Sequence, residues 1–354
     1  MNEKLICLRN KIRTMDLDAM IVSNPLNIKY LTNIKAEGLL ILGRKENHFI
    51  TDGRYIEDVN NTLTIMDGIV VHDQKNLSKE DMENFFLFCE NVGFEENYIT
   101  YSTYKEYMYK FKINNFVETE NIIEKQRAIK DQEEIAKITK ACLLTDKCFE
   151  YIIKFIKKGM TEKEIAQEIE AFFRRNGAEK LAFDTIVASG PNSSKPHAVP
   201  TDRKIESGDV VTLDMGCICD EYCSDMTRTI FVDYVPEEVK EIYELVLKNQ
   251  RQTAEEMREG IVCKNLSKMV ENDFDLHGYN LVHALGHGVG MDIHELPVLG
   301  MNSEVILKSN MVITSEPGIY IPGKFGVRIE DTVLVGKSVG ISLTKSKKDY
   351  VIIR

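Results

Sequence analysis

Two pairs of acidic residues carry the strongest chemical signal in the sequence. Asp214 and Asp225 lie in strand-like runs, separated by residues that favour a chain reversal. A turn centred on Cys219 and Asp220 would place the two carboxylates opposite each other, about 5 Å apart, where like charges repel. Apolar residues flank both positions, so burial would make this repulsion costly unless a divalent cation balances it. The pair therefore predicts a metal site.

A second pair repeats this geometry further along the chain. Glu316 and Glu330 lie in two strand-like runs joined by a segment that contains Pro and Gly, and a turn near Gly323 would pair them. For either pair the alternative is that each acid is the polar member of an alternating strand with one face in water. The residues between the two hairpins favour the metal site.

Those residues include three of the seven histidines, which fall within the 12 residues from His283 to His294. Glycines flank the middle one, His287, on both sides, which allows close backbone approach and leaves the imidazole little steric cover. A fourth histidine, His197, lies in a loop rich in Ser and Pro, where functional side chains are often placed. A single histidine is more often structural than a ligand, so the grouping among glycines is what indicates a site.

Three cysteines in the first hairpin need separate consideration. Cys217, Cys219 and Cys223 could suggest a zinc knuckle, but no fourth Cys or His follows at a suitable spacing. We therefore interpret them as hairpin residues, although thiols beside a metal site could be sensitive to oxidation or bind soft metals. The other five cysteines are scattered, which is typical of reduced thiols.

The elements that must position these residues follow from the hydrophobic pattern. Apolar residues recur at helical spacing from residue 131 to 156, and a capping box at Thr161 and Glu164 begins a second helix that Gly177 ends. Strand-like runs come next, and the same order of helices and strands then recurs. This pattern predicts an α+β domain built from two related halves, with the strands starting near Phe183 and running to Val335 and the second pair of helices over 236–258 and 262–272.

The first third of the chain predicts a separate, smaller α/β domain. A helix over 5–17 and buried strands over 19–22 and 38–42 are bounded by turn residues. We place the amino-terminal domain at 1–124 and the domain with the candidate site at 125–354.

Composition limits the possible partners. The 354 residues include 45 Lys plus Arg against 56 Asp plus Glu, a net charge of −11, so the clustered positive charge that nucleic-acid binding needs is lacking. The first residues are interrupted by charges, unlike a signal peptide, and no apolar run reaches the ~20 residues of a membrane span. We expect a cytoplasmic protein with neither a nucleic-acid nor a membrane partner.

The motifs around the candidate ligands resemble those of a known family, the Xaa-Pro peptidases, which include aminopeptidase P and prolidase. The resemblance implies a pita-bread catalytic domain preceded by a creatinase-like α/β domain, and the segments 24–32 and 50–55 are similar to that amino-terminal domain. At Asn33 and Ile34 many members have Gly and an aromatic residue instead. The metal-site motifs are Leu213–Gly216, Ser224–Thr229, Gly286–Gly290, Ser315–Tyr320 and Gly326–Thr332, with Pro196–Ala198 besides.

The resemblance also implies ligands, roles and partners. Two divalent ions, Mn²⁺ first and Co²⁺ or Zn²⁺ as alternatives, would bridge a hydroxide that attacks the bond between an amino-terminal residue and a following proline. Short peptides with proline in second position would be the substrates, and the protein would be a homodimer. The metal ligands would be Asp214, Asp225, His287, Glu316 and Glu330, and Glu316 would also be the general base. His294 and His197 would stabilise the intermediate. The substrate would be contacted by His283, Tyr320 and Arg328, or these three would support the residues that contact it.

The sequence leaves open the length of the substrate and two alternative functions. The pocket could accept only dipeptides, as in prolidases, or longer peptides, as in aminopeptidase P. A metal-free hydrolase of the creatinase type and a non-catalytic binding protein are the alternatives, and the filled ligand positions argue against both.

Overall fold

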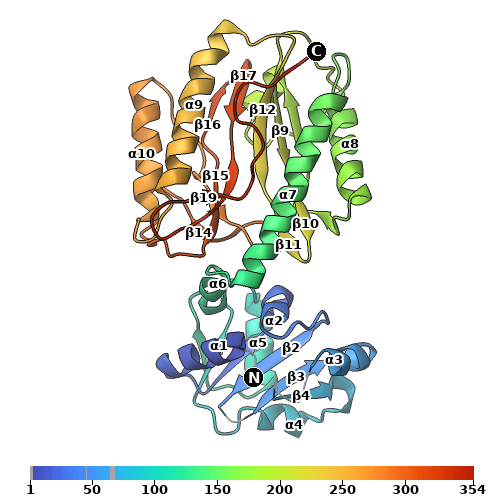
Figure 1. The fold of residues 1–354 in the computed structure, drawn as a ribbon. Helices are drawn as coiled ribbons and strands as arrows, with labels where there is room; N and C mark the ends of the chain where they lie inside the picture. Colours follow the sequence, from blue (N-terminus) through green and yellow to red (C-terminus); the bar gives the residue numbers. More distant parts are fainter. Residues whose placement is uncertain (1–2, 45, 64–67) are drawn as a thin grey trace. The chain divides into compact units, whose positions relative to one another are not determined.

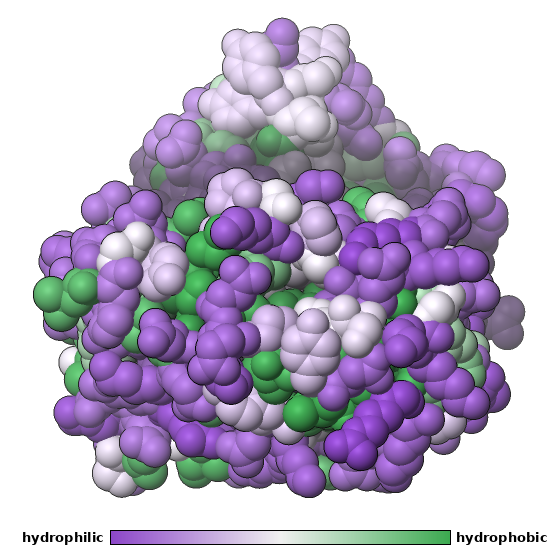
Figure 2. Space-filling model, turned by 90° about the horizontal axis from the view of Figure 1, so that it is seen from above, coloured by the Kyte–Doolittle hydropathy of each residue, from purple (hydrophilic) through white to green (hydrophobic). Residues whose placement is uncertain are grey.

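The computed structural model describes residues 3–44, 46–63 and 68–354. The chain folds as two separate units, Met1–Arg127 and Ala128–Arg354. No helix within the described residues is both long and apolar enough to cross a membrane. Hydrophilic side chains cover most of the face seen in Figure 2, with hydrophobic ones showing between them in separate patches.

The first unit is an α/β structure around one six-stranded sheet (Figure 1). The strand order is β4-β3-β2-β1-β5-β6, and β2 runs antiparallel to both of its neighbours while the other pairs are parallel. The predicted strands at 19–22 and 38–42 are confirmed. The elements are α1 (Glu3–Thr14), β1 (Ala19–Val22), α2 (Pro25–Thr32), β2 (Gly38–Gly43), β3 (Asn47–Thr51), α3 (Ile56–Thr62), β4 (Ile69–Asp73), α4 (Lys79–Asn84), β5 (Asn91–Phe94), α5 (Tyr101–Lys110), β6 (Asn115–Glu118) and α6 (Ile122–Arg127).

Two helices begin the second unit, as the apolar spacing predicts. The first, α7 (Gln132–Phe155), starts with a capping box between Asp131 and Glu134. The second, α8 (Glu162–Arg175), starts with the predicted box between Thr161 and Glu164. Both helices bury apolar residues in one core with strands β8 (Ile186–Ser189), β9 (Val210–Met215) and β12 (Met226–Val232).

A second pair of helices, α9 (Glu237–Glu256) and α10 (Cys263–Leu276), shares another core with β15 to β18. In Figure 1 each pair covers its own group of strands, so the predicted two-halved order of elements is confirmed. The strands are β7 (Lys180–Leu181), β8 (Ile186–Ser189), β9 (Val210–Met215), β10 (Cys217–Cys219), β11 (Tyr222–Cys223), β12 (Met226–Val232), β13 (His287–Gly288), β14 (Glu295–Val298), β15 (Val312–Ser315), β16 (Gly318–Ile321), β17 (Phe325–Arg328), β18 (Asp331–Leu334), β19 (Ile341–Ser342) and β20 (Ile352–Ile353).

The register of the first hairpin differs from the predicted one. Asp214 pairs with Thr227 rather than with Asp225, because the turn is centred on Asp220 and Glu221. Both turn residues have positive φ, 47° and 72°, as in a type I′ turn. The error is two residues, and since side chains alternate with a period of two, Asp214 and Asp225 keep a common face.

The register of the second hairpin is as predicted. Strands β16 and β17 pair Gly318 with Arg328, and β15 and β18 pair Ser315 with Asp331. Glu316 and Glu330 lie between these two paired segments, at the same register. The two hairpins therefore bring all four acids to strand ends in the middle of the second unit.

Candidate metal centre

The candidate ligands come together in the second unit. Asp225, His287 and Glu330 each offer a ligand atom within 4.8 Å of the others. Nε2 of His287 lies 3.5 Å from Oδ2 of Asp225 and 3.5 Å from Oε1 of Glu316. Asp214, the fifth candidate, contributes to the electrostatic potential at Asp225, Glu316 and Glu330. The arrangement is thus a buried group of four carboxyls around one imidazole.

Burial makes this group unfavourable when it is ionised. Asp225 and Glu330 are 5% and 2% exposed. Burial first, and neighbouring carboxylates second, raise the pKa of Asp225 and Glu330 well above their usual values, and burial also raises the pKa of Glu316. Burial lowers the pKa of His287, which keeps the imidazole neutral and able to bind a metal.

The donor set fits hard divalent cations. Oδ1 of Asp214 is buried and has no hydrogen-bond partner among the described residues, although buried carboxylate oxygens are normally paired. Its other oxygen, Oδ2, accepts a hydrogen bond of 2.7 Å from Arg328. Four carboxylates with a single imidazole suit Mn²⁺ and similar ions, and bound cations would satisfy both the orphaned oxygen and the surplus negative charge.

Hydroxyl groups orient two of the acids. Thr227 donates a hydrogen bond of 2.7 Å to Oε2 of Glu330, and Thr314 donates one of 3.1 Å to Oε1 of Glu316. Thr314 Oγ1 also accepts a hydrogen bond from the backbone N–H of His287. Sequence reasoning did not single out either threonine, although Thr227 lies within one of the family motifs.

A chain of hydrogen bonds joins the predicted substrate residues to one ligand. Besides Asp214, Arg328 donates to the Tyr320 hydroxyl at 2.8 Å, and that hydroxyl lies 3.0 Å from Nε2 of His283. Arg328 also holds the carbonyl of Pro196 at 3.0 Å, one residue before His197. Burial lowers the pKa of His283 and raises that of Tyr320. The structure therefore brings these predicted residues together, with Arg328 at the junction.

The two remaining histidines lie at the exposed side of the group. The ring of His294 packs edge-on against that of His287, with centroids 4.4 Å apart. His197 follows a short 3₁₀ helix, Gly190–Ser194, and lowers the pKa of His294 and of His283 electrostatically, after burial and the other neighbours. Both residues are exposed.

A buried ion pair supports the segment that carries His294. Nζ of Lys130 lies 3.2 Å from Oε2 of Glu295, and their side chains are 1% and 5% exposed. Oε1 of Glu295 accepts a hydrogen bond from the backbone N–H of Asp292. This pair lies outside every motif, and nothing in the local sequence could have indicated it.

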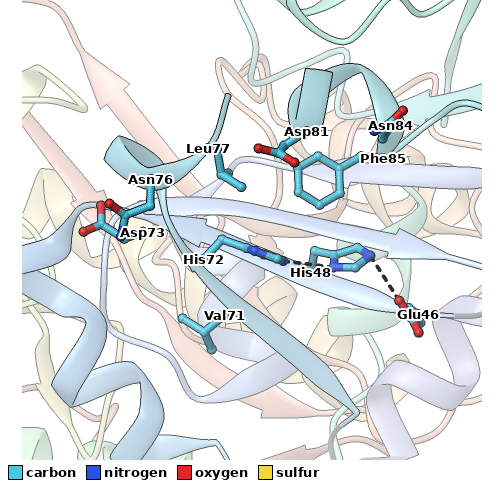
Figure 3. A pocket seen from close by; sticks show the side chains of 10 residues that line it. All are labelled: Glu46, His48, Val71, His72, Asp73, Asn76, Leu77, Asp81, Asn84 and Phe85. Carbon is cyan, nitrogen blue, oxygen red and sulfur yellow. Dashed lines mark hydrogen bonds and ion pairs between the residues drawn. The ribbon is translucent and has the colours of Figure 1, made fainter. Parts of the chain in front are cut away.

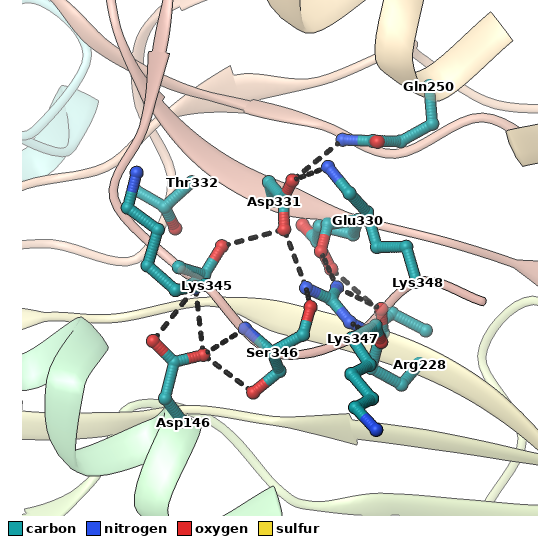
Figure 4. Close-up of polar contacts among 12 residues, drawn as sticks. Asp146, Arg228, Gln250, Glu330, Asp331, Thr332, Lys345, Ser346, Lys347 and Lys348 are labelled. Carbon is teal, nitrogen blue, oxygen red and sulfur yellow. Dashed lines mark hydrogen bonds and ion pairs between the residues drawn. The ribbon is translucent and has the colours of Figure 1, made fainter. Parts of the chain in front are cut away.

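A second buried network fixes the backbone beside Glu330 (Figure 4). Arg228 donates to the carbonyl of Glu330 and to Oδ1 of Asp331, and its other contacts include the carbonyls of Ser346 and Lys347. Lys348 and Gln250 both donate to Oδ2 of Asp331. The sequence near the carboxyl end is thereby held against the strand that follows the ligand.

The hairpin cysteines are free thiols, as are the other five. Sγ of Cys217 and Sγ of Cys219 are 3.9 Å apart in the buried core, and Cys223 Sγ contacts the carbonyl of Met291. Among the described residues, the group of three candidate metal ligands is Asp225, His287 and Glu330 and includes no cysteine, so the interpretation of the three cysteines as hairpin residues agrees with the structure.

Comparison with known proteins covers both units. Residues 136–337 match metallopeptidase family M24, and residues 5–129 match the creatinase/prolidase N-terminal domain. The chain is 36% identical to a Bacillus subtilis protein described as an uncharacterized peptidase, YqhT, over 99% of this chain and 100% of that one. It is also 36% identical to the Xaa-Pro dipeptidase of Pyrococcus horikoshii, over 99% of each chain.

Solved structures of peptidases are also similar to this chain over nearly its whole length. A Xaa-Pro dipeptidase from Bacillus anthracis superposes with a TM-score of 0.93 at 35% identity, covering 99% of each chain. An X-Pro aminopeptidase from Thermotoga maritima gives a TM-score of 0.86 at 30% identity, covering 97% of this chain and 100% of that one. The similarity therefore extends over nearly the whole chain.

Proposed function

The chain belongs to metallopeptidase family M24, and we therefore propose that it hydrolyses the bond between an amino-terminal residue and a following proline, using two divalent metal ions. Relatives named Xaa-Pro dipeptidase, 36% and 35% identical over 99% of the chain, support this substrate class. The metal dependence rests on the buried group of four carboxyls and one neutral imidazole. The pKa values of Asp225 and Glu330 are raised by burial and by the neighbouring carboxylates, and the positive charge of Arg328 does not fully offset this effect.

Asp214, Asp225, His287, Glu316 and Glu330 would hold the metals. Mn²⁺ is our first choice, with Co²⁺ or Zn²⁺ as alternatives, because oxygen ligands dominate the set. When bound, two such ions lower the pKa of a water molecule and polarise the scissile carbonyl as Lewis acids.

The chain's own residues would then guide protons and the substrate. Glu316, whose pKa burial raises, is the proposed general base, because a base works best when its pKa lies near the working pH. His294 and His197 are exposed beside the ligands and are the proposed donors to the charge that develops on the substrate oxygen. The linked side chains of Arg328, Tyr320 and His283 are proposed to form the adjoining wall of the pocket.

Metal removal tests the proposal directly. After dialysis against a chelator, hydrolysis of Ala-Pro should be lost, and it should return when Mn²⁺ is added. Full hydrolysis by the metal-free protein would show that the reaction needs no metal, as in the alternative of a creatinase-type hydrolase. No hydrolysis of any Xaa-Pro substrate with Mn²⁺ present would favour a non-catalytic binding protein.

Comparison of Ala-Pro with Ala-Pro-Ala separates two forms of the activity. The relatives include proteins named dipeptidase and one named aminopeptidase, so the pocket beyond the proline decides between them. Rapid cleavage of the dipeptide alone would identify a prolidase.

We further propose a cytoplasmic homodimer. The eight free thiols support a reducing compartment, and light scattering would measure the oligomeric state.

A further inference from the structure

A pair of histidines on the sheet of the first unit forms a site that the peptidase reaction does not use. His48 on β3 and His72 on β4 point toward each other from neighbouring parallel strands (Figure 3). Nδ1 of His48 lies 3.1 Å from Nε2 of His72, and Phe85 packs against both rings with centroids 4.9 and 5.3 Å away. The two imidazoles are therefore held together with their nitrogens facing each other.

The spacing of the two nitrogens suits a shared metal ion. Imidazole nitrogens bind Zn²⁺ at about 2.0–2.1 Å, and two such bonds at angles of about 90–109° place the nitrogens about 2.8–3.4 Å apart. The observed 3.1 Å lies inside this range. For an ion bound to both nitrogens, each metal–nitrogen bond would make an angle of about 40° with the line between the nitrogens, so the rings would turn to direct their lone pairs at the ion.

Glu46 favours the tautomer that such a site requires. Its Oε2 lies 4.0 Å from Nε2 of His48, the nitrogen that faces away from His72. A carboxylate there attracts the ring proton to Nε2 and leaves the lone pair on Nδ1, as in the carboxylate–histidine–metal arrangements of metal sites. The proton that Nε2 of His72 now shares with His48 would move to Nδ1 of His72. The neutral pair would then bind the ion without releasing a net proton.

The surroundings favour a cation. The pair borders a hollow of 660 Å³ whose lining contains the carboxylates Glu46, Asp73 and Asp81 and, among the described residues, neither Lys nor Arg. Burial lowers the pKa of both histidines, so their lone pairs are available near neutral pH. The hollow leaves room for water molecules to complete the coordination, which the two protein nitrogens alone do not fill.

We propose that His48 and His72 bind a divalent transition-metal ion of the Zn²⁺ type, in a site in the amino-terminal unit separate from the catalytic group. Two imidazoles with water suit Zn²⁺, Ni²⁺ and Cu²⁺ and are poor ligands for Mn²⁺. This preference differs from that of the oxygen-rich group, for which Mn²⁺ is the first choice.

The test titrates Zn²⁺ into the full-length protein and compares the number of ions bound. The wild type should bind one equivalent more than His48→Gln or His72→Gln, measured by calorimetry and by metal analysis after desalting. His277→Gln is the matched control, because His277 is an exposed histidine at the end of α10 whose Nδ1 contacts the carbonyl oxygen of Asp273. This control should bind as many ions as the wild type.

Equal stoichiometry in the wild type and both variants would overturn the proposal. Because a variant could lose its fold, the wild type labelled with ¹⁵N-histidine gives a second measurement. Zn²⁺ should shift the Nδ1 resonance of His48 and the Nε2 resonance of His72, and the absence of such shifts at saturation would also overturn it. Neither result depends on the peptidase proposal, since both read the histidine pair directly.

Discussion

At the scale of single residues, the site is defined by charges that the fold holds at an energetic cost. Asp225 and Glu330 have raised pKa values because burial, and after it the charges of neighbouring carboxylates, disfavour ionisation. Such a cost is typical of functional sites, where a ligand restores the balance. The residues can therefore be tested one at a time, with the metal content and the activity measured together.

Asp225→Asn should remove both activity and metal. The change keeps the size of the side chain but removes one of the charges that attract the cations, so we expect turnover to fall by more than the about 10- to 100-fold typical for loss of a group that merely supports a ligand. Asp220→Asn, in the exposed turn of the same hairpin, is the control. Full activity with unchanged metal content in Asp225→Asn would refute the ligand assignment.

His294→Ala should slow turnover while both metals stay bound. A donor aimed at developing charge contributes about 10²- to 10³-fold to kcat, and the ring contacts His287 without being one of the proposed ligands. Steady-state kinetics with Ala-Pro and metal analysis would check this, with His277→Ala as the control. Loss of metal in His294→Ala would place this histidine among the ligands.

At the scale of elements, sequence patterns predicted the helices and the faces of the strands better than their register. The apolar spacing of α7 and α8 and the capping box of α8 depend on local sequence and were predicted correctly, whereas the capping box of α7 was not predicted. The turn at Asp220 and Glu221 uses residues that only uncommonly take positive φ, so no Asn-Gly or Asp-Gly signal marked it. The buried contacts of Arg228 join segments about 100 residues apart, and local patterns cannot indicate them.

The ion pair of Lys130 and Glu295 should matter more when one partner is removed than when both are. Lys130→Met removes the buried cation beside Glu295, and removal of one partner of a buried ion pair typically costs about 3–5 kcal/mol. Urea unfolding of Lys130→Met and of the double variant with Glu295→Gln would show this, with the double variant nearer the wild type. Equal free energies of unfolding for Lys130→Met and the wild type would mean that the ion pair does not contribute to stability.

Asp331 should make the second unit sensitive to acid. Burial acts to raise its pKa, but Arg228 and Lys348 outweigh burial and lower it to about 2. A lowered pKa in the folded state gives stability above the unfolded value, near 4, that is lost as the pH falls toward 2. This contribution is about 2 kcal/mol. Asp331→Asn should therefore be less stable at pH 6 but lose less stability on acidification, as measured by denaturant unfolding across this range.

At the scale of the whole molecule, the family comparison confirms the predicted combination of a pita-bread catalytic domain with a creatinase-type domain. Composition alone argued against nucleic-acid and membrane partners, but it could not show which of the 56 acids are candidate metal ligands. Two divalent ions would change the net charge from −11 to −7, so the protein stays acidic when loaded. The motifs, rather than the totals, predicted the site.

Metal binding should stabilise the two units unequally. Ions that bind only the folded state add about 2.7 kcal/mol each at 100 times their Kd, and the oxygen-rich group belongs to residues 128–354. Calorimetry of the protein loaded with Mn²⁺ alone should show that chelation lowers the Tm of that unit and that Mn²⁺ restores it, while the unit of residues 1–127, whose histidine pair is a poor Mn²⁺ site, is unchanged. In Asp225→Asn the chelator should have little effect; an equal shift in both units would contradict this expectation.

The pairing of β9 with β12 has a consequence for how the chain can change in length. A slip by two residues leaves Asp214 and Asp225 on one face, whereas a slip by one would turn Asp225 away from its partners. An even shift keeps the acids on one face, but two residues of a strand span about 6.8 Å, more than the 4.8 Å within which the candidate ligand atoms lie. Insertions and deletions that shift this pairing would therefore dismantle the centre without altering any candidate ligand, an odd shift by turning Asp225 to the other face and an even one by moving it out of reach.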